Sequence, residues 1–157
     1  MALWHRLFIH SNHSSHTMKQ IFSLLILLTV GTLMSLQAQS FKVIVNNDNA
    51  VTSLTKKEAS DFFLKKKSKW VTGTAVMPVD LSSSSAVRES FSKQVHGKTT
   101  AAIRNFWQQA AFSGAGTAPA EKATDADVLE YVKKNPGAIG YVSAAASTAG
   151  VKTVPIK

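Results

Sequence analysis

A run of four serines is the first place where residue types and spacing could do chemistry. Ser82–Ser85 follow an apolar segment, Ala75–Val79, and precede a helical pattern, so their hydroxyls and amides would gather at a helix start. Such a position favours anions, because the free amides and the helix dipole both attract negative charge. Arg88 lies one turn further on and could add a bidentate contact to an oxyanion. In a simpler interpretation, one serine caps the helix and the others fill a loop.

Two further segments could contact anions. The glycines of Ser113–Pro119 allow backbone to approach a phosphate closely, and an ordinary loop between helices would explain them equally well. Lys65–Lys69 is a basic run followed by Trp70. It lacks the interleaved aromatic residues of a nucleic-acid site, so we predict no nucleic-acid partner. A solvated loop is the favoured interpretation, and attraction to an anionic lipid surface is an alternative.

The residue content argues against catalysis. The chain has no cysteine, which excludes disulfides, thiolate metal sites, iron–sulfur clusters and a cysteine nucleophile. Four of its five histidines lie within residues 1–17. The remaining one, His96, has no carboxylate at a suggestive spacing, and we interpret it as a helix-end residue that complements the dipole. No metal-hydrolase or nucleophile-elbow motif follows. We therefore predict a protein that is not an enzyme, with no catalytic residues, metal or cofactor.

The amino-terminal part has the features of a targeting sequence. Met18-Lys19-Gln20 precedes a leucine-rich run, Ile21–Leu36, and a small residue follows at Ala38. This pattern predicts a signal peptide over residues 1–38, cleaved near Ala38, and a periplasmic or otherwise secreted mature protein. A retained membrane anchor is the alternative, although the run is shorter than a spanning helix needs. Because a normal signal begins at Met18, we interpret residues 1–17 as an extension of the gene model.

Removing residues 1–38 leaves 119 residues, enough for a single domain with one core. The formal charge falls from +9 to +7, because only Arg6 and Lys19 are removed from the basic residues. The net positive charge of such an exported protein would attract anions.

The mature part, residues 39–157, alternates strand and helix patterns. This alternation predicts an α/β fold with a small mixed sheet, at least some parallel pairing, and about four helices. Pro78 indicates that its strand lies at an edge or ends early. The expected strands are Phe41–Val45, Ala75–Val79, Ala138–Val142 and a further one within Val151–Ile156. The expected helices start at Thr55, near Val87, at Thr99 or Thr100, and at Thr124.

Four motifs in this order resemble the phosphate ABC-transporter substrate-binding proteins. Asn135–Val142 is the most specific, being similar to that family's T-P-G-A-I-G-Y-V segment. The others are Leu54–Lys66 with Trp70, Ala75–Ser85, and Phe106–Trp107 with Phe112–Gly116. The similarity covers nearly all of residues 41–142, and it places this chain with the short, single-lobe members.

The resemblance implies one lobe of a type II periplasmic-binding-protein fold and an exported protein that binds phosphate or a similar oxyanion. Ser83, Ser84 and Ser85 stand where the family has its Ser-Gly-Thr anion loop. The family's arginine falls near Val79 and Asp80 here, so Arg88 is the substitute candidate. Members of the family deliver phosphate to a membrane permease, which is therefore an expected partner. A second copy forming a homodimer, or an envelope partner protein, would complete the cleft. The protein would be an accessory or sensory binder. The alternative is an interaction module that kept the fold and lost the ligand.

Overall fold

The computed structural model describes residues 41–157. The predicted signal peptide, its cleavage site near Ala38 and the proposed extension over residues 1–17 lie outside this range. Within the described part of the chain, no helix is both long and apolar enough to cross a membrane.

Five strands form one mixed sheet in the order β3-β2-β4-β1-β5. The inner strand β2 runs parallel to both of its neighbours, β3 and β4, whereas β1 runs antiparallel to β4 and β5. The mixed sheet and its parallel pairs are therefore confirmed. The strands are β1 (Phe41–Val45), β2 (Met77–Leu81), β3 (Ala120–Lys122), β4 (Ala138–Ser143) and β5 (Lys152–Val154).

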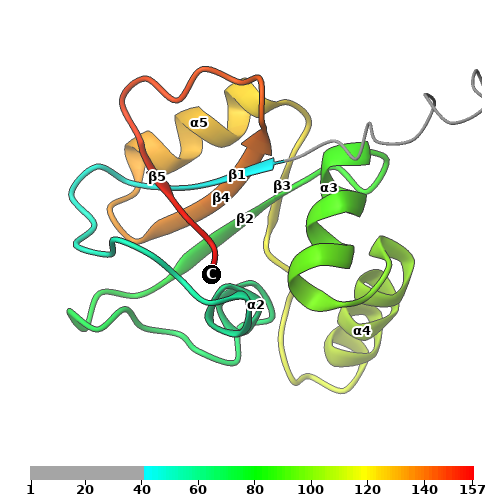
Figure 1. Cartoon of the computed structure of the whole chain (residues 1–157). Coiled ribbons are helices and arrows are strands. Elements are labelled where there is room, and N and C mark those ends of the chain that lie inside the picture. Colours follow the sequence, from blue (N-terminus) through cyan, green and yellow to red (C-terminus); the bar gives the residue numbers. More distant parts are fainter. Residues whose placement is uncertain (1–40) are drawn as a thin grey trace, which may run out of the picture. The chain divides into compact units, whose positions relative to one another are not determined.

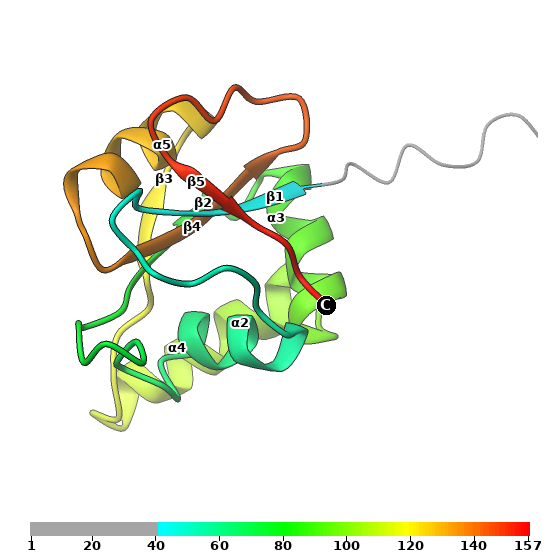
Figure 2. The ribbon, with the colours of Figure 1, turned by 60° about the vertical axis from the view of Figure 1, so that its left-hand side comes forward.

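Between residues 41 and 157, four α-helices and one π-helical turn connect the strands. They are α2 (Lys56–Phe63), α3 (Ala86–Phe91), the π-helix η1 (Ser92–His96), α4 (Thr100–Phe112) and α5 (Asp125–Lys134). α5 covers one face of the sheet, and α2 and α3 lie on the other (Figures 1 and 2). The predicted α/β class with about four helices is confirmed.

The helix starts are set by side chains that satisfy free backbone amides. Thr55 and Glu58 form a reciprocal capping box at α2, and Thr124 and Asp127 form another at α5. At the end of η1, Gly97 adopts a φ of 65°, the left-handed conformation that stops a helix at least cost for glycine.

The core on the α2 and α3 side is aromatic. The Tyr141 ring stacks on Phe91, with centroids 3.9 Å apart and planes 7° from parallel. Phe63 packs beside both rings, and Phe41 meets Phe91 edge to face. Because Tyr141 is held between sheet and helices, its hydroxyl reaches the end of β2, where the serine run begins.

The prediction for the strand around Pro78 was wrong in two respects. The strand bounds are displaced by two residues, and the strand does not lie at the sheet edge. β2 begins at Met77 rather than Ala75 and continues to Leu81, between β3 and β4. Pro78 is tolerated because β3 pairs with β2 only from Val79 onward, so no partner on that side needs the missing amide hydrogen. The short strand β3 was not predicted, since Ala120-Glu121-Lys122 has no apolar pattern.

His96 ends η1, as expected for a helix-end residue, but it does not complement the helix dipole. Its Nδ1 lies 2.9 Å from the Ser60 hydroxyl, and its ring meets Phe63 and Phe91 edge to face. Burial, together with the positive charges of Arg88 and Lys66, lowers the pKa of His96 to about 4, so the ring is neutral at pH 7. A neutral imidazole cannot complement the helix dipole, and His96 instead packs where η1 meets α2.

Gly140 is needed where β4 meets α5. A Cβ there would lie 2.8 Å from a methyl carbon of Val79 and of Val128, which is closer than real contacts allow. Gly140→Ala is therefore expected to lower the free energy of unfolding by about 1–3 kcal/mol through overpacking. Denaturant unfolding checks this value. Val128→Ala in the same chain should recover part of the loss by making room, and strictly additive losses would contradict the overpacking explanation.

Candidate functional site

The serine run forms a tight turn between β2 and α3. Ser85 is the N-cap of α3, and its hydroxyl accepts a hydrogen bond from the amide of Arg88 at 3.4 Å. The amide of Ser85 donates to the carbonyl of Ser82 at 2.9 Å, which closes the turn. The amide of Ser82 donates to the Lys122 carbonyl at 2.8 Å and ties the turn to β3. We call Ser82–Ser85 the serine turn.

Several backbone donors at the serine turn have no acceptor. Within residues 41–157, no carbonyl or side chain accepts from the amides of Ser83, Ser84, Ala86 or Val87. Ser83, Ser84 and Ala86 are exposed. The hydroxyls of Ser82 and Ser84 lie 3.1 Å apart, so one can donate to the other and leave a further donor free. The turn thus offers a group of unused donors at the start of α3, which suits an anion.

Arg88 points into the protein rather than toward solvent. It is 3% exposed. Its Nη1 donates to the Leu81 carbonyl at 2.6 Å and to Glu121 on β3, and its Nη2 donates to Asp80 Oδ2 at 3.3 Å. The guanidinium therefore links the ends of β2 and β3 to α3. It forms ion pairs with two carboxylates, those of Asp80 and Glu121.

Asp80 is the centre of this buried network. Its second carboxylate oxygen, Oδ1, accepts a hydrogen bond from the Tyr141 hydroxyl at 2.9 Å. Burial raises the pKa of Asp80 to about 6, although the positive charge of Arg88 opposes the rise. Burial and the neighbouring carboxylate likewise raise the pKa of Tyr141 above its ordinary value, so the phenol stays protonated.

The structure brings together most of the predicted site. Ser83, Ser84 and Ser85 share one turn, as the spacing requires. Arg88 lies close to them in sequence, but its guanidinium is committed to Asp80, Glu121 and Leu81 instead of facing the turn.

Three members of the network were missed as functional residues: Asp80, Glu121 and Tyr141. Asp80 had a visible signal, since a charged residue inside an otherwise apolar strand is buried only when paired. Glu121 had none, because its strand has no apolar pattern.

Two grooves of the described chain lie away from the serine turn. One is lined by β1, η1 and the segment after β5, and the other by α4 and the end of α2. Within residues 41–157, no three His, Asp or Glu side chains converge as metal ligands.

The sheet order and the helices on both faces define one lobe of a periplasmic-binding-protein-like α/β fold. An ABC-type phosphate transport receptor from Vibrio cholerae superposes with a TM-score of 0.59 at 17% identity, covering 76% of this chain and 48% of that one. PstS from Borrelia burgdorferi gives 0.59 at 14% identity, covering 75% and 47%.

The predicted resemblance is therefore confirmed for the fold. The chain spans about half the length of these solved structures. No protein-family model matches the sequence, and no curated protein matches it.

Proposed function

We propose that this chain is an exported, accessory or sensory protein that binds phosphate or a similar oxyanion at the serine turn. The observation that carries the proposal is the set of unused amide and hydroxyl donors at the start of α3, in a fold similar to phosphate transport receptors. The proposed anion would lie against Ser83, Ser84 and Ser85, and it would be held by neutral donors and the helix dipole.

The affinity expected for this site is low. Each charge-assisted hydrogen bond contributes about 1.5–3 kcal/mol, but an exposed site recovers only part of that because water competes for both partners. Arg88 adds little, since Asp80 and Glu121 already neutralise it. We therefore expect a dissociation constant in the millimolar range. A permease or an envelope protein that covers the turn would tighten binding by excluding water.

Calorimetric titration with phosphate and with sulfate tests the proposal. With a dissociation constant of about 1 mM, 10 mM phosphate stabilises the fold by about 1.4 kcal/mol, which a thermal shift detects. Ser84→Asp should abolish both signals, because it places a negative charge beside the donors. Aspartate before a helix start favours folding, so loss of binding would not reflect unfolding.

Ser68→Asp is the matched control, since it adds the same charge to an exposed serine in a different loop. It should leave the titration unchanged. Absence of heat and of any thermal shift in the unaltered protein at millimolar phosphate would reject the proposal.

A second candidate is an interaction module that keeps the fold without the ligand. The specific observation in its favour is that the one buried cation of the site, Arg88, is paired with carboxylates. A pull-down from envelope extract that recovers one stoichiometric partner, unaffected by phosphate or by Ser84→Asp, would support this candidate instead.

A further inference from the structure

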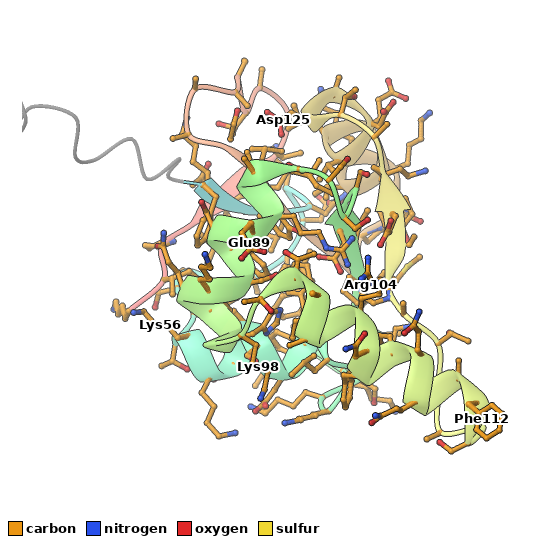
Figure 3. All side chains as sticks on the ribbon, turned by 90° about the vertical axis from the view of Figure 1, so that its right-hand side faces the viewer. Lys56, Glu89, Lys98, Arg104, Phe112 and Asp125 are labelled. Atoms are coloured by element: carbon orange, nitrogen blue, oxygen red, sulfur yellow. The ribbon has the colours of Figure 1, made fainter. Side chains whose placement is uncertain are left out.

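The outer side of α4 presents an aromatic surface that the rest of residues 41–157 does not cover. α4 packs mainly against η1, and Figure 3 shows Phe112 at its far end, directed away from the ribbon. Phe112 is 97% exposed and Phe106 is 40% exposed. Phe106 meets Trp107 edge to face, with ring centroids 5.0 Å apart, and contiguous apolar surface of this kind marks interaction sites.

A groove runs beside Phe106 and Trp107. It has a volume of about 450 Å³. We call it the α4 groove. It is lined by Leu64, Lys65, Phe106, Trp107, Gln109, Ala110, Ser113, Ala115 and Gly116. The glycine-containing loop after α4, which the anion-binding proposal leaves unused, forms one of its walls.

Trp107 gives the groove an unused polar group. The residue is 7% exposed, and its indole Nε1 is buried with no acceptor within residues 41–157. A buried donor without a partner is rare in folded proteins, and each case calls for an explanation. Trp107 lines the groove, so a ligand that opens the wall around its ring and offers a carbonyl or carboxylate oxygen would supply the missing acceptor.

The rim of the groove is basic. The Lys65 ammonium lies 5.8 Å from the centroid of the Trp107 ring and donates to the Ala118 carbonyl at 3.3 Å. Lys66 follows it in sequence. α4 carries Arg104 (labelled in Figure 3) and no acidic residue. A second copy of this chain would bring an equally basic surface, so charge disfavours a homodimer through this face.

We propose that the α4 groove binds an acidic, amphipathic segment of a partner protein. An apolar side chain of the segment packs on Phe106 and Trp107, and an adjacent carboxylate meets Lys65. A peptide segment is favoured over a membrane because the α4 groove is concave, and a flat lipid surface does not fill it. This proposal is independent of anion binding at the serine turn.

The test uses a short fluorescein-labelled peptide of alternating leucine, phenylalanine and glutamate, with a lysine-for-glutamate peptide as control. The acidic peptide should raise fluorescence polarisation on adding the purified chain, and the basic peptide should not. Lys65→Glu and Phe106→Ala should each weaken binding roughly tenfold. Lys69→Glu makes the same charge change in the same loop but lines no part of the groove, so it should leave binding unchanged.

Indole signals in a ¹H–¹⁵N spectrum locate the contact. The signal of Trp107 should shift when the acidic peptide binds. Trp70 serves as the internal reference, because its Nε1 already donates to the Gly137 carbonyl at 3.0 Å and should not shift. Equal binding of both peptides, equal effects of Lys65→Glu and Lys69→Glu, or a Trp107 shift produced only by phosphatidylglycerol vesicles would overturn the proposal.

Discussion

Replacing Arg88 with methionine is expected to lower the free energy of unfolding by about 3–5 kcal/mol at pH 7. Asp80 is 5% exposed, and Arg88 is the cation paired with it. Without the guanidinium, the carboxylate would be buried with only the Tyr141 hydroxyl as donor, and the Leu81 carbonyl would lose its donor as well. Methionine retains most of the apolar contact surface of the stem, so the loss measures the charge and its hydrogen bonds. Denaturant unfolding gives the value.

The double variant separates charge from packing. Without Arg88, the Asp80 carboxyl must either stay charged without its partner or take up a proton at pH 7, and both cost stability. Adding Asp80→Asn to Arg88→Met removes this carboxyl group, so the double variant should be more stable than Arg88→Met alone. If Asp80→Asn makes the Arg88→Met chain still less stable, the penalty comes from lost packing, and the ionic explanation fails.

The stability of the protein should also depend on the protonation of Asp80. The folded-state pKa of about 6 lies above the ordinary value of 3.8. Between these values the folded chain binds a proton that the unfolded chain releases, so the free energy of unfolding falls as pH rises through this window. The shift corresponds to about 3 kcal/mol, fully present below pH 4 and lost above pH 6.

Comparison with Asp80→Asn isolates this contribution from other carboxyl groups. Hydrogen bonds from Thr100 lower the pKa of Glu89 to about 2, so that group contributes stability above pH 4 and loses it as pH falls. Subtracting the pH profile of Asp80→Asn from that of the unaltered protein removes such opposing effects. The difference should decline from pH 4 to pH 6, and a flat difference would contradict the raised pKa of Asp80.

Local signals in the sequence were sufficient for most of the fold. The capping residues Thr55 and Thr124 were enough to predict where two helices begin. The segment Phe41–Val45 formed the expected strand. β3 and the π-helical turn η1 were not predictable in this way. β3 depends on its pairing with β2, which its own sequence does not indicate. η1 follows a regular fourfold spacing of Val87, Phe91 and Val95, and this spacing does not indicate the wider π-helical turn.

The site was predictable only in part for a similar reason. The serine turn depends on neighbours in sequence, so its position between a strand and a helix followed from the local pattern. The partners of Arg88 depend on which strands lie together. Asp80 and Glu121 are neighbours in register across β2 and β3, a pairing that the sequence pattern alone does not contain.

The most direct test of the central claim is a phosphate titration followed by backbone amide shifts in ¹H–¹⁵N spectra of the purified chain. The claim predicts saturable shifts of the amides of Ser83, Ser84, Ala86 and Val87, with little change at the α4 groove. Ser84→Asp should abolish these shifts, and Ser68→Asp should preserve them. Shifts that do not saturate and are spread over exposed lysine residues, such as those of the basic run Lys65–Lys69, would contradict the claim. The absence of any shift at the serine turn would also contradict it.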